Sequence, residues 1–190
     1  MMKKKFLFIG RGKKSFAVLQ AFLAKKISFE EVWISDKFNE GCDDKFRELT
    51  IKKKIKIKFI SEIGKKEIKE LKKLNIDYVF CLFWKFKIKK QYLSTVPFIN
   101  LHFGFLPSYR GNACINWAII RNETLTGVTI HFMDEFLDSG PIIMKKKIKI
   151  KLKDNITYLD EKFLNEGIKL LIKFVHNLRT KKKMVYKKQK

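Results

Sequence analysis

The sequence predicts an α/β protein built on a doubly wound, mostly parallel sheet in a single domain. Short apolar runs alternate along the chain with charged segments of helical periodicity, which is the pattern of strands joined by helices. The run from Asp77 to Phe83 is apolar after its first residue, as is typical of strands buried on both faces of a parallel sheet. A chain of 190 residues, 46% hydrophobic and 14% aromatic, is large enough for one core.

The first half of the chain predicts four strands and three helices. An apolar strand at 5–9 ends at Gly10-Arg11-Gly12, and a helix follows through about residue 25. Ser15 stands where a dinucleotide-binding fingerprint would need its third glycine, so the turn disfavours a dinucleotide site. Binding of a phosphate group at the N-terminus of the helix remains an alternative. Residues 55–60 alternate at period two, which predicts an edge or half-exposed strand. The other elements expected here are a strand at 31–36, helices at 42–50 and 64–74, and the apolar strand at 77–83.

The second half predicts three further strands and two helices. The strands are expected at 98–102, 128–133 and 141–152, and the helices at 113–121 and 156–178. Ligands of doubly wound sheets bind beyond the carboxyl ends of the strands, and the 98–102 strand ends at His102. We expect the folded domain to cover 1–180 and residues 181–190 to form a basic C-terminal tail, with a short added strand as the alternative.

The net charge of +24 is the most extreme feature of the composition. Such a balance can indicate a nucleic-acid surface, but 38 of the 43 basic residues are lysines, and the arginines that read base edges are scarce. A general bias toward lysine explains the charge more simply. Three isolated cysteines predict neither a zinc site nor a disulfide framework, so the expected compartment is the reducing cytoplasm. No apolar run reaches about 18 residues, and therefore no membrane helix is expected.

Candidate catalytic residues stand at the end of the 98–102 strand and in a later turn. Asn100 and His102 are two residues apart, so on a strand their side chains share one face. A carboxamide can hold a developing oxyanion, an imidazole can move a proton near neutral pH, and the Asp138 carboxylate can orient the imidazole. This set suits acyl transfer to an amine. Taken singly, a histidine in an apolar run is usually a packed core residue, and Asp138 has ordinary turn chemistry.

Four motifs in a fixed order surround these residues. They read Asn100-Leu101-His102, Leu106-Pro107-Ser108-Tyr109-Arg110-Gly111, Gly127-Val128-Thr129-Ile130-His131 and Asp138-Ser139-Gly140. The set resembles the catalytic core of the 10-formyltetrahydrofolate-dependent formyltransferases, which include the methionyl-tRNA, glycinamide ribonucleotide and sugar N-formyltransferases. The resemblance is dense over 97–143 and looser, though colinear, over 4–96. It implies a Rossmann-like formyltransferase fold over 1–180, with Asn100, His102 and Asp138 as catalytic residues.

The resemblance also implies a site for the co-substrate 10-formyltetrahydrofolate. The pterin is expected between a loop at 83–88, which lines its pocket, and a loop at 133–138, which holds it partly through backbone groups. For the first loop, ordinary aromatic packing is an equal alternative. The expected cofactor-binding residues are Phe83, Trp84, Lys85, Phe86, Ile88, Met133, Asp134 and Leu137. No metal is expected, because the sequence has no cluster with metal-ligand spacing.

The expected acceptor is a small molecule, the amine of a sugar linked to a nucleotide. Methionyl-tRNA formyltransferases carry a second, tRNA-binding domain for which this sequence predicts no room, and residues 112–116 depart from the Gly-Ala-Ala-Pro-Ile-Gln of that branch. A methionyl-tRNA formyltransferase-like enzyme without that domain and a glycinamide ribonucleotide formyltransferase remain alternatives, as does a non-catalytic basic binding protein. Nucleic acid and membrane are not expected partners, and a homodimer is left open. The expected substrate-binding residues are Arg11, Lys13, Tyr109, Arg110, Gly111 and Asn112.

Overall fold

The computed structural model describes residues 4–37 and 40–189. Seven strands form one sheet in the order β3-β2-β1-β4-β5-β6-β7, and parallel pairs join β1, β2, β3, β4 and β5 while β6 and β7 are antiparallel. The prediction of an α/β, mostly parallel sheet is confirmed. The chain packs as two compact units, Met1–Asn100 and Leu101–Lys190, which are described in turn.

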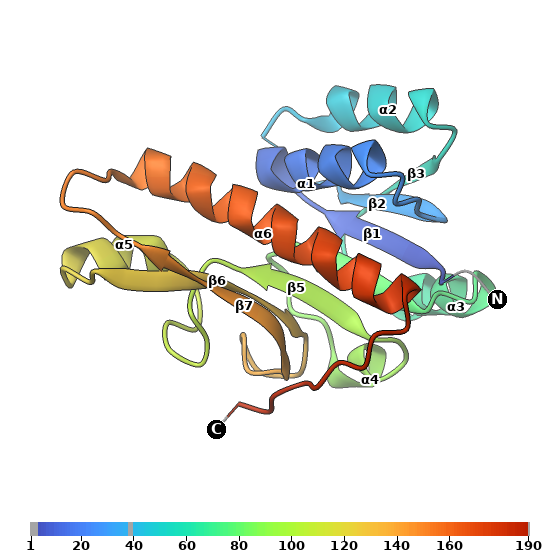
Figure 1. The fold of residues 1–190 in the computed structure, drawn as a ribbon. Coiled ribbons are helices and arrows are strands. Elements are labelled where there is room, and N and C mark those ends of the chain that lie inside the picture. The colour runs from blue at the N-terminus through green and yellow to red at the C-terminus, as the bar shows by residue number, and fades with distance from the viewer. Residues whose placement is uncertain (1–3, 38–39, 190) are drawn as a thin grey trace. The chain divides into compact units, whose positions relative to one another are not determined.

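The unit Met1–Asn100 has the winding expected of strands joined by crossover helices. Its helices α1 and α2 lie side by side (Figure 1), and the rings of Phe16 and Phe46 meet between them with centroids 5.1 Å apart. β3 lies at the edge of the sheet, as its alternating sequence predicts. The elements are β1 (Phe6–Gly10), α1 (Gly12–Ala24), β2 (Glu31–Ser35), α2 (Asp43–Lys52), β3 (Lys56–Ile60), α3 (Lys65–Lys73), β4 (Tyr78–Leu82) and α4 (Lys90–Leu93), followed by the start of β5 (Phe98–His102).

Phenylalanines form the centre of this unit. The ring of Phe80 on β4 lies 5.6 Å from that of Phe6 on β1 and 5.1 Å from that of Phe22 on α1. Phe29, just before β2, packs against Phe8 at 5.5 Å and Phe22 at 5.4 Å. Edge-to-face and tilted pairs of this kind add to the free energy of burial, so this cluster fixes α1 on the sheet.

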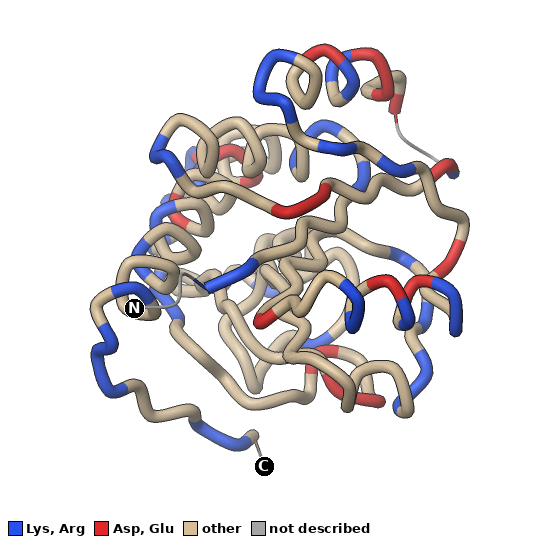
Figure 2. The backbone as a smooth tube through the Cα atoms, turned by 90° about the vertical axis from the view of Figure 1, so that its right-hand side faces the viewer, with Lys and Arg blue, Asp and Glu red and all other residues tan. Residues whose placement is uncertain are grey.

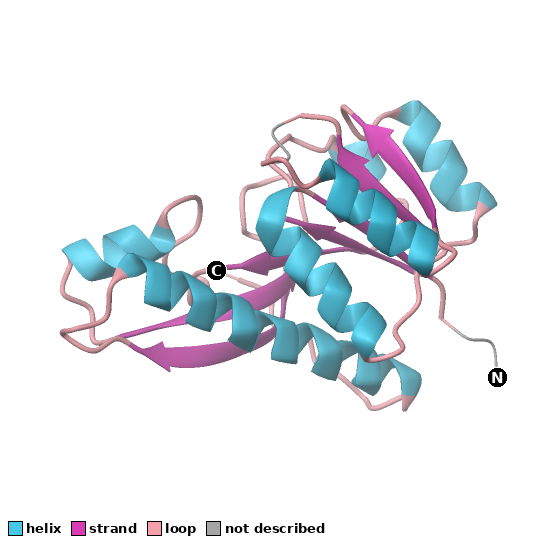
Figure 3. Ribbon diagram, turned by 90° about the horizontal axis from the view of Figure 1, so that it is seen from above, coloured by secondary structure: helices cyan, strands magenta, loops and turns pink. Residues whose placement is uncertain are grey.

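The unit Leu101–Lys190 is an antiparallel pair of strands covered by one long helix (Figures 1 and 3). The helix begins where Asn155 accepts a hydrogen bond from the Tyr158 N–H at 2.8 Å, an ordinary N-cap. Phe163 in its middle is fully buried, and its ring lies 5.7 Å from that of Phe103. The elements are α5 (Cys114–Ile120), β6 (Leu125–Phe132), β7 (Ile142–Lys149) and α6 (Ile156–Arg179).

Two features differ from the sequence expectation or add to it. The four-residue helix α4 was not predicted, because a single turn has too few residues to show a helical period. Within residues 181–190, Lys187 pairs with Ile142 at the start of β7, with N···O distances of 2.8 and 3.0 Å. The boundary between a domain at 1–180 and a tail at 181–190 therefore remains a prediction.

The lysines are spread over helices, strands and the C-terminal segment rather than gathered on one element (Figure 2). Some of them hold the edge strand in place. On β3, Lys58 contacts Glu70 at 2.7 Å and Glu67 at 3.2 Å, and Lys56 contacts Glu31 at 2.6 Å. In the described part of the chain, no helix is long and apolar enough to cross a membrane.

Candidate active site

Strand β5 ends in the two polar side chains that the sequence singles out. Asn100 is half-buried, and His102 is only 6% exposed. Because they alternate with Leu101, both side chains leave the same face of the strand. The carboxyl end of β5 is therefore where a ligand of this sheet would meet them.

Both ring nitrogens of His102 face oxygen atoms. Nδ1 lies 3.2 Å from Oδ2 of Asp138, and Nε2 lies 2.6 Å from the carbonyl oxygen of Tyr109. A neutral imidazole has one N–H, so only one of these contacts can then be a hydrogen bond, whereas an imidazolium satisfies both. In either neutral tautomer one ring nitrogen faces an oxygen without a hydrogen between them, and we assign the hydrogen to Nε2 because its contact of 2.6 Å is the shorter of the two.

Asp138 is a buried carboxylate that receives donors on both oxygens. Its Oδ2 accepts the Gly111 N–H at 3.0 Å, and its Oδ1 lies 3.3 Å from Nε2 of His131. Burial by itself raises the pKa of Asp138, but the hydrogen bond from His131, the charge of His102 and the Gly111 N–H outweigh burial, so the pKa lies below its ordinary value. Asp138 is thus ionised at neutral pH.

Strand β6 presents Thr129 and His131 on one face, two residues apart. The Thr129 hydroxyl donates to the Gly104 carbonyl at 2.7 Å and accepts the Leu106 N–H at 3.2 Å, which fixes the chain leaving β5. The register shifts between Ile130, which pairs with Met144, and His131, which pairs with Ile142, so the extra residue of this bulge is Ile143 of β7. His131 belongs to one of the four sequence motifs but was not predicted to have a role. Its spacing of two residues from Thr129, which puts both side chains on one face of a strand, was the signal that could have indicated one.

Two glycines lie where backbone or ring atoms approach closely. A Cβ at Gly104 would collide with Nε2 of His102 and lie 2.7 Å from the Tyr109 carbonyl oxygen. A Cβ at Gly140 would collide with the Phe132 carbonyl. The N–H of Phe132 donates a hydrogen bond to the carbonyl of Pro141, the residue after Gly140. Neither position accepts a side chain without movement of the chain around His102 and Asp138.

Burial determines the protonation state of the His102 ring and of the neighbouring Cys114 thiol. Burial lowers the pKa of His102, and the charge of Asp138 and the Tyr109 carbonyl oppose that effect only in part. His102 is therefore neutral at pH 7. Asp138 and the Tyr109 carbonyl are both placed to accept hydrogen bonds from its charged form. Cys114 Sγ lies 2.9 Å from the Tyr109 carbonyl and 3.6 Å from His102 Nε2, and burial raises its pKa to about 11, so it is a thiol rather than a thiolate.

The loop at 83–88 lies in the unit Met1–Asn100. The rings of Trp84 and Phe86 meet edge to face at 5.2 Å, and Phe83 has a left-handed backbone with φ of 58°. The indole N–H of Trp84 is the one buried side-chain polar atom of the described residues that has no hydrogen-bond partner. Such a donor is costly to bury alone and suits an acceptor on a heteroaromatic ligand. Ile88, at 4% exposure, packs inside, and Lys85 is exposed.

The loop at 133–138 lies in the unit Leu101–Lys190 and is closed by its own side chains. Asp134 Oδ1 accepts from the Ser139 hydroxyl at 2.5 Å and from the Phe136 N–H at 3.2 Å. Met133 is half-buried, while Leu137 is 67% exposed. Asp134 thus shapes the loop, and Leu137 is available to a ligand.

The residues expected to bind the acceptor fall into two groups. In the second unit, the Tyr109 hydroxyl donates to Glu123 at 2.6 Å, Arg110 is exposed and bonds to Gln189, and Asn112 is exposed. In the first unit, Arg11 is buried and donates from Nε to the Phe83 carbonyl at 3.3 Å, while Lys13 is exposed. Arg11 therefore also supports the 83–88 loop.

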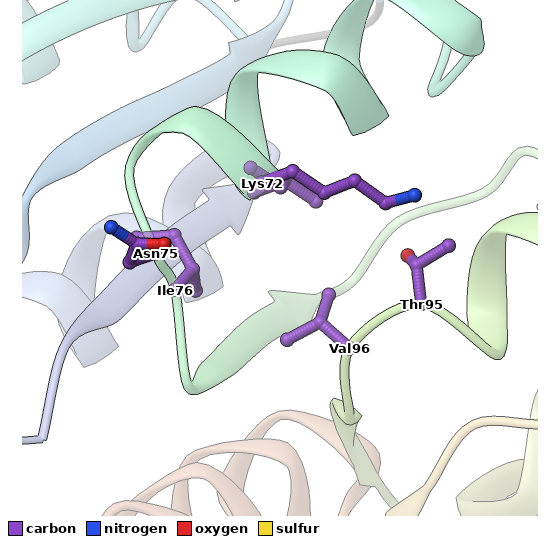
Figure 4. Close-up of a pocket in the computed structure, with 6 residues that line it drawn as sticks. Lys72, Asn75, Ile76, Thr95 and Val96 are labelled. Carbon is purple, nitrogen blue, oxygen red and sulfur yellow. The ribbon is translucent and has the colours of Figure 1, made fainter.

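A cavity of about 300 Å³ opens at the other end of the strands (Figure 4). It is lined by Lys72 in the last turn of α3, by Asn75 and Ile76 after that helix, and by Thr95 and Val96 before β5. Because these segments lead into the amino ends of β4 and β5, the cavity is not where a doubly wound sheet binds its ligand. The cluster around His102 is the better candidate.

Comparison with known proteins agrees with that choice. A family model described as formyl transferase matches residues 39–175. The methionyl-tRNA formyltransferase of Thermodesulfovibrio yellowstonii is 40% identical over 114 residues, which are 59% of this chain and 37% of that protein. That of Clostridium tetani is 35% identical over 136 residues, 70% of this chain and 44% of that protein. This chain spans less than half the length of these relatives.

Solved structures share the fold. The phosphoribosylglycinamide formyltransferase of Bacillus halodurans superposes with a TM-score of 0.79 at 23% identity, covering 95% of this chain and 97% of that one. An N-formyltransferase of Helicobacter canadensis, solved with folinic acid and dTDP-3-aminofucose, gives a TM-score of 0.74 at 22% identity, covering 99% of this chain and 68% of that one. At these identities the likeness is evidence for the fold alone.

Proposed function

Because this chain belongs to the formyl transferase family, we propose that it moves a formyl group from 10-formyltetrahydrofolate to an amine, with Asn100, His102 and Asp138 as catalytic residues. The observation that carries the proposal is the buried His102, whose two nitrogens face the Asp138 carboxylate and a loop carbonyl. A neutral ring with acceptors already placed for its charged form is suited to a step in which charge develops.

The chemistry joins the acceptor nitrogen to the formyl carbon and breaks the bond from that carbon to the folate nitrogen. The folate supplies the activated formyl group. Asn100 and the Nε2–H of His102 donate to the formyl oxygen, where negative charge develops. The Nε2–H therefore exchanges its present acceptor, the Tyr109 carbonyl, for the formyl oxygen. Asp138 stabilises the imidazolium form of His102, which is the stronger donor to that oxygen, and the amine proton passes to the folate nitrogen directly or through water.

The residues present fit a folate. In the 83–88 loop, Trp84 offers a buried indole N–H without a partner, next to the Phe86 ring. A pterin combines a flat apolar face with ring nitrogens that accept hydrogen bonds, which matches this pairing. The three cysteines are free and buried, which suits the reducing cytoplasm in which we place the reaction.

The acceptor in our proposal is an amino sugar linked to a nucleotide. Exposed Arg110 can meet a phosphate oxygen, and a diphosphate needs only a few such cations. Sequence relatives favour a second candidate, methionyl-tRNA, because the matched curated proteins at 33% to 47% identity are methionyl-tRNA formyltransferases. This chain covers less than half the length of those relatives, so their match does not decide between the amino sugar and methionyl-tRNA.

Salt dependence separates the two acceptors. A tRNA held by six to ten phosphate contacts loses roughly a thousandfold or more in affinity between low and moderate salt, whereas a diphosphate loses far less. We expect formylation of a nucleotide-linked 3-amino- or 4-amino-deoxy sugar with shallow salt dependence, and none of charged initiator tRNA. Efficient, steeply salt-sensitive formylation of that tRNA would replace the first candidate with the second.

A further inference from the structure

Gln189, in the C-terminal segment, uses its whole carboxamide on two loops. Its Nε2 donates to the Asp138 carbonyl at 3.0 Å and to the Gly140 carbonyl at 2.7 Å. Its Oε1 accepts from Nε of Arg110 at 3.3 Å and from Nη2 at 3.1 Å. Both donors and both lone pairs of the amide are thereby engaged.

The backbone around Gln189 is held in place independently. Two residues earlier, Lys187 exchanges both backbone hydrogen bonds with Ile142 on β7. One residue further back, the Tyr186 ring meets the Phe132 ring edge to face, with centroids 4.9 Å apart. The segment is therefore docked beside β7, and the Gln189 side chain reaches the loops from a fixed origin.

Each loop that Gln189 contacts also contacts His102. Arg110 stands between Tyr109, whose carbonyl meets His102 Nε2, and Gly111, whose N–H meets the Asp138 carboxylate. Asp138 has a left-handed backbone, with φ of 51°, which costs free energy for a non-glycine residue unless neighbours hold it. The Gln189 amide binds the carbonyl of that same residue.

We propose that Gln189 is a positioning residue, which ties the 109–111 loop to the 138–140 loop and so keeps Asp138 and the Tyr109 carbonyl on the two nitrogens of His102. The inference rests on the proposed function, because it assigns the role by way of His102. Only asparagine, which is one methylene shorter, carries the same two groups: a glutamate keeps the acceptor for Arg110 but has no donor for the two carbonyls, and a lysine has donors but no acceptor.

The test compares Gln189→Ala and Gln189→Glu with Lys188→Ala, whose exposed side chain makes the matched control. Misplacing a catalytic group by about 1 Å costs up to a hundredfold, so we expect kcat to fall by about tenfold or more in both Gln189 variants, with the KM for the folate changing much less. Lys188→Ala should match the wild type. Equal kcat in all four proteins, or faster turnover in Gln189→Ala because the segment obstructs the acceptor, would overturn the proposal.

A second readout needs no turnover. The pKa of His102 can be followed by NMR, with His102→Gln used to assign its signal. The groups that face the ring are Asp138, His131, the Cys114 thiol and the Tyr109 carbonyl. If Gln189 holds Asp138 in place, its loss should lower the His102 pKa further, because the opposite charge moves away. An unchanged pKa in Gln189→Ala contradicts the inference even if formyl transfer by the wild type is never observed, whereas absent transfer with a shifted pKa refutes only the proposed function.

Discussion

Asp138→Asn is the substitution whose effect the structure predicts most directly. The asparagine keeps the volume of the side chain and an oxygen for the Gly111 N–H, but it removes the negative charge 3.2 Å from His102 Nδ1. Asp138 is 7% exposed and His102 is 6% exposed, so water screens the pair only weakly. The imidazolium form of His102 therefore loses its nearest counter-charge.

The size of the effect can be worked out from that distance. Two unit charges 3.2 Å apart attract by roughly 5 kcal/mol at an effective dielectric of about 20. Relaxation and the residual amide dipole recover part of this, so we take a loss of about 3 to 4 kcal/mol from the state in which His102 is charged. At 1.36 kcal/mol per factor of ten, kcat should fall by about two to three orders of magnitude.

The assay is steady-state formyl transfer by purified protein, with the release of tetrahydrofolate as the signal. Glu161→Gln removes an exposed carboxylate from the same unit and serves as the control for net charge. Circular dichroism and melting temperature should show that Asp138→Asn is folded. A kcat of folded Asp138→Asn within about threefold of the wild-type value, less than about 1 kcal/mol by the same conversion, would show that Asp138 does not stabilise a charged His102.

Three further results are expected. Gly104→Ala should reduce turnover by at least about tenfold, because a Cβ there collides with His102 Nε2; unchanged kinetics would mean that the ring and the Tyr109 carbonyl need not be where they are. Trp84→Phe should weaken binding of a stable folate analogue by about fivefold in calorimetry, the value of one hydrogen bond, and equal affinity would remove Trp84 from the site. Because the pKa of His102 is lowered in the folded state, the wild type should lose stability as the pH falls below the unfolded pKa near 6.5. Between pH 7.5 and 5.5 its free energy of unfolding, measured by urea denaturation, should fall relative to that of His102→Gln by up to about 1.4 kcal/mol per pH unit; a constant difference would contradict a neutral buried ring.

Local pattern was enough for most of the fold. The apolar run at 77–83 became β4, the central strand of the sheet, and the alternating run at 55–60 became the edge strand β3, because period and hydrophobicity record burial directly. The start of β6 was placed three residues late, at 128 rather than Leu125, because Leu125 and Thr126 follow a turn and carry too little pattern of their own.

The site was predictable only where a motif spans it. The pairing of His102 with Asp138 followed from the resemblance, and the structure brings them within 3.2 Å. The contact between the Tyr109 carbonyl and His102 Nε2 involves a residue with a left-handed backbone, and a tyrosine gives no sequence signal for that conformation. Gln189 reaches Asp138 across 51 residues of sequence, and a lone glutamine in a lysine-rich segment gives no local signal.

We infer that this chain transfers a formyl group with the help of His102. The most direct measurement is a single-turnover reaction in which labelled 10-formyltetrahydrofolate and a panel of nucleotide-linked amino sugars are mixed with excess protein, and the formylated amine is detected by mass spectrometry. We expect product with wild-type protein and, because loss of one preorganised donor costs a hundredfold or more, at most about a hundredth of that rate with folded His102→Gln. Equal rates for the two proteins would contradict it.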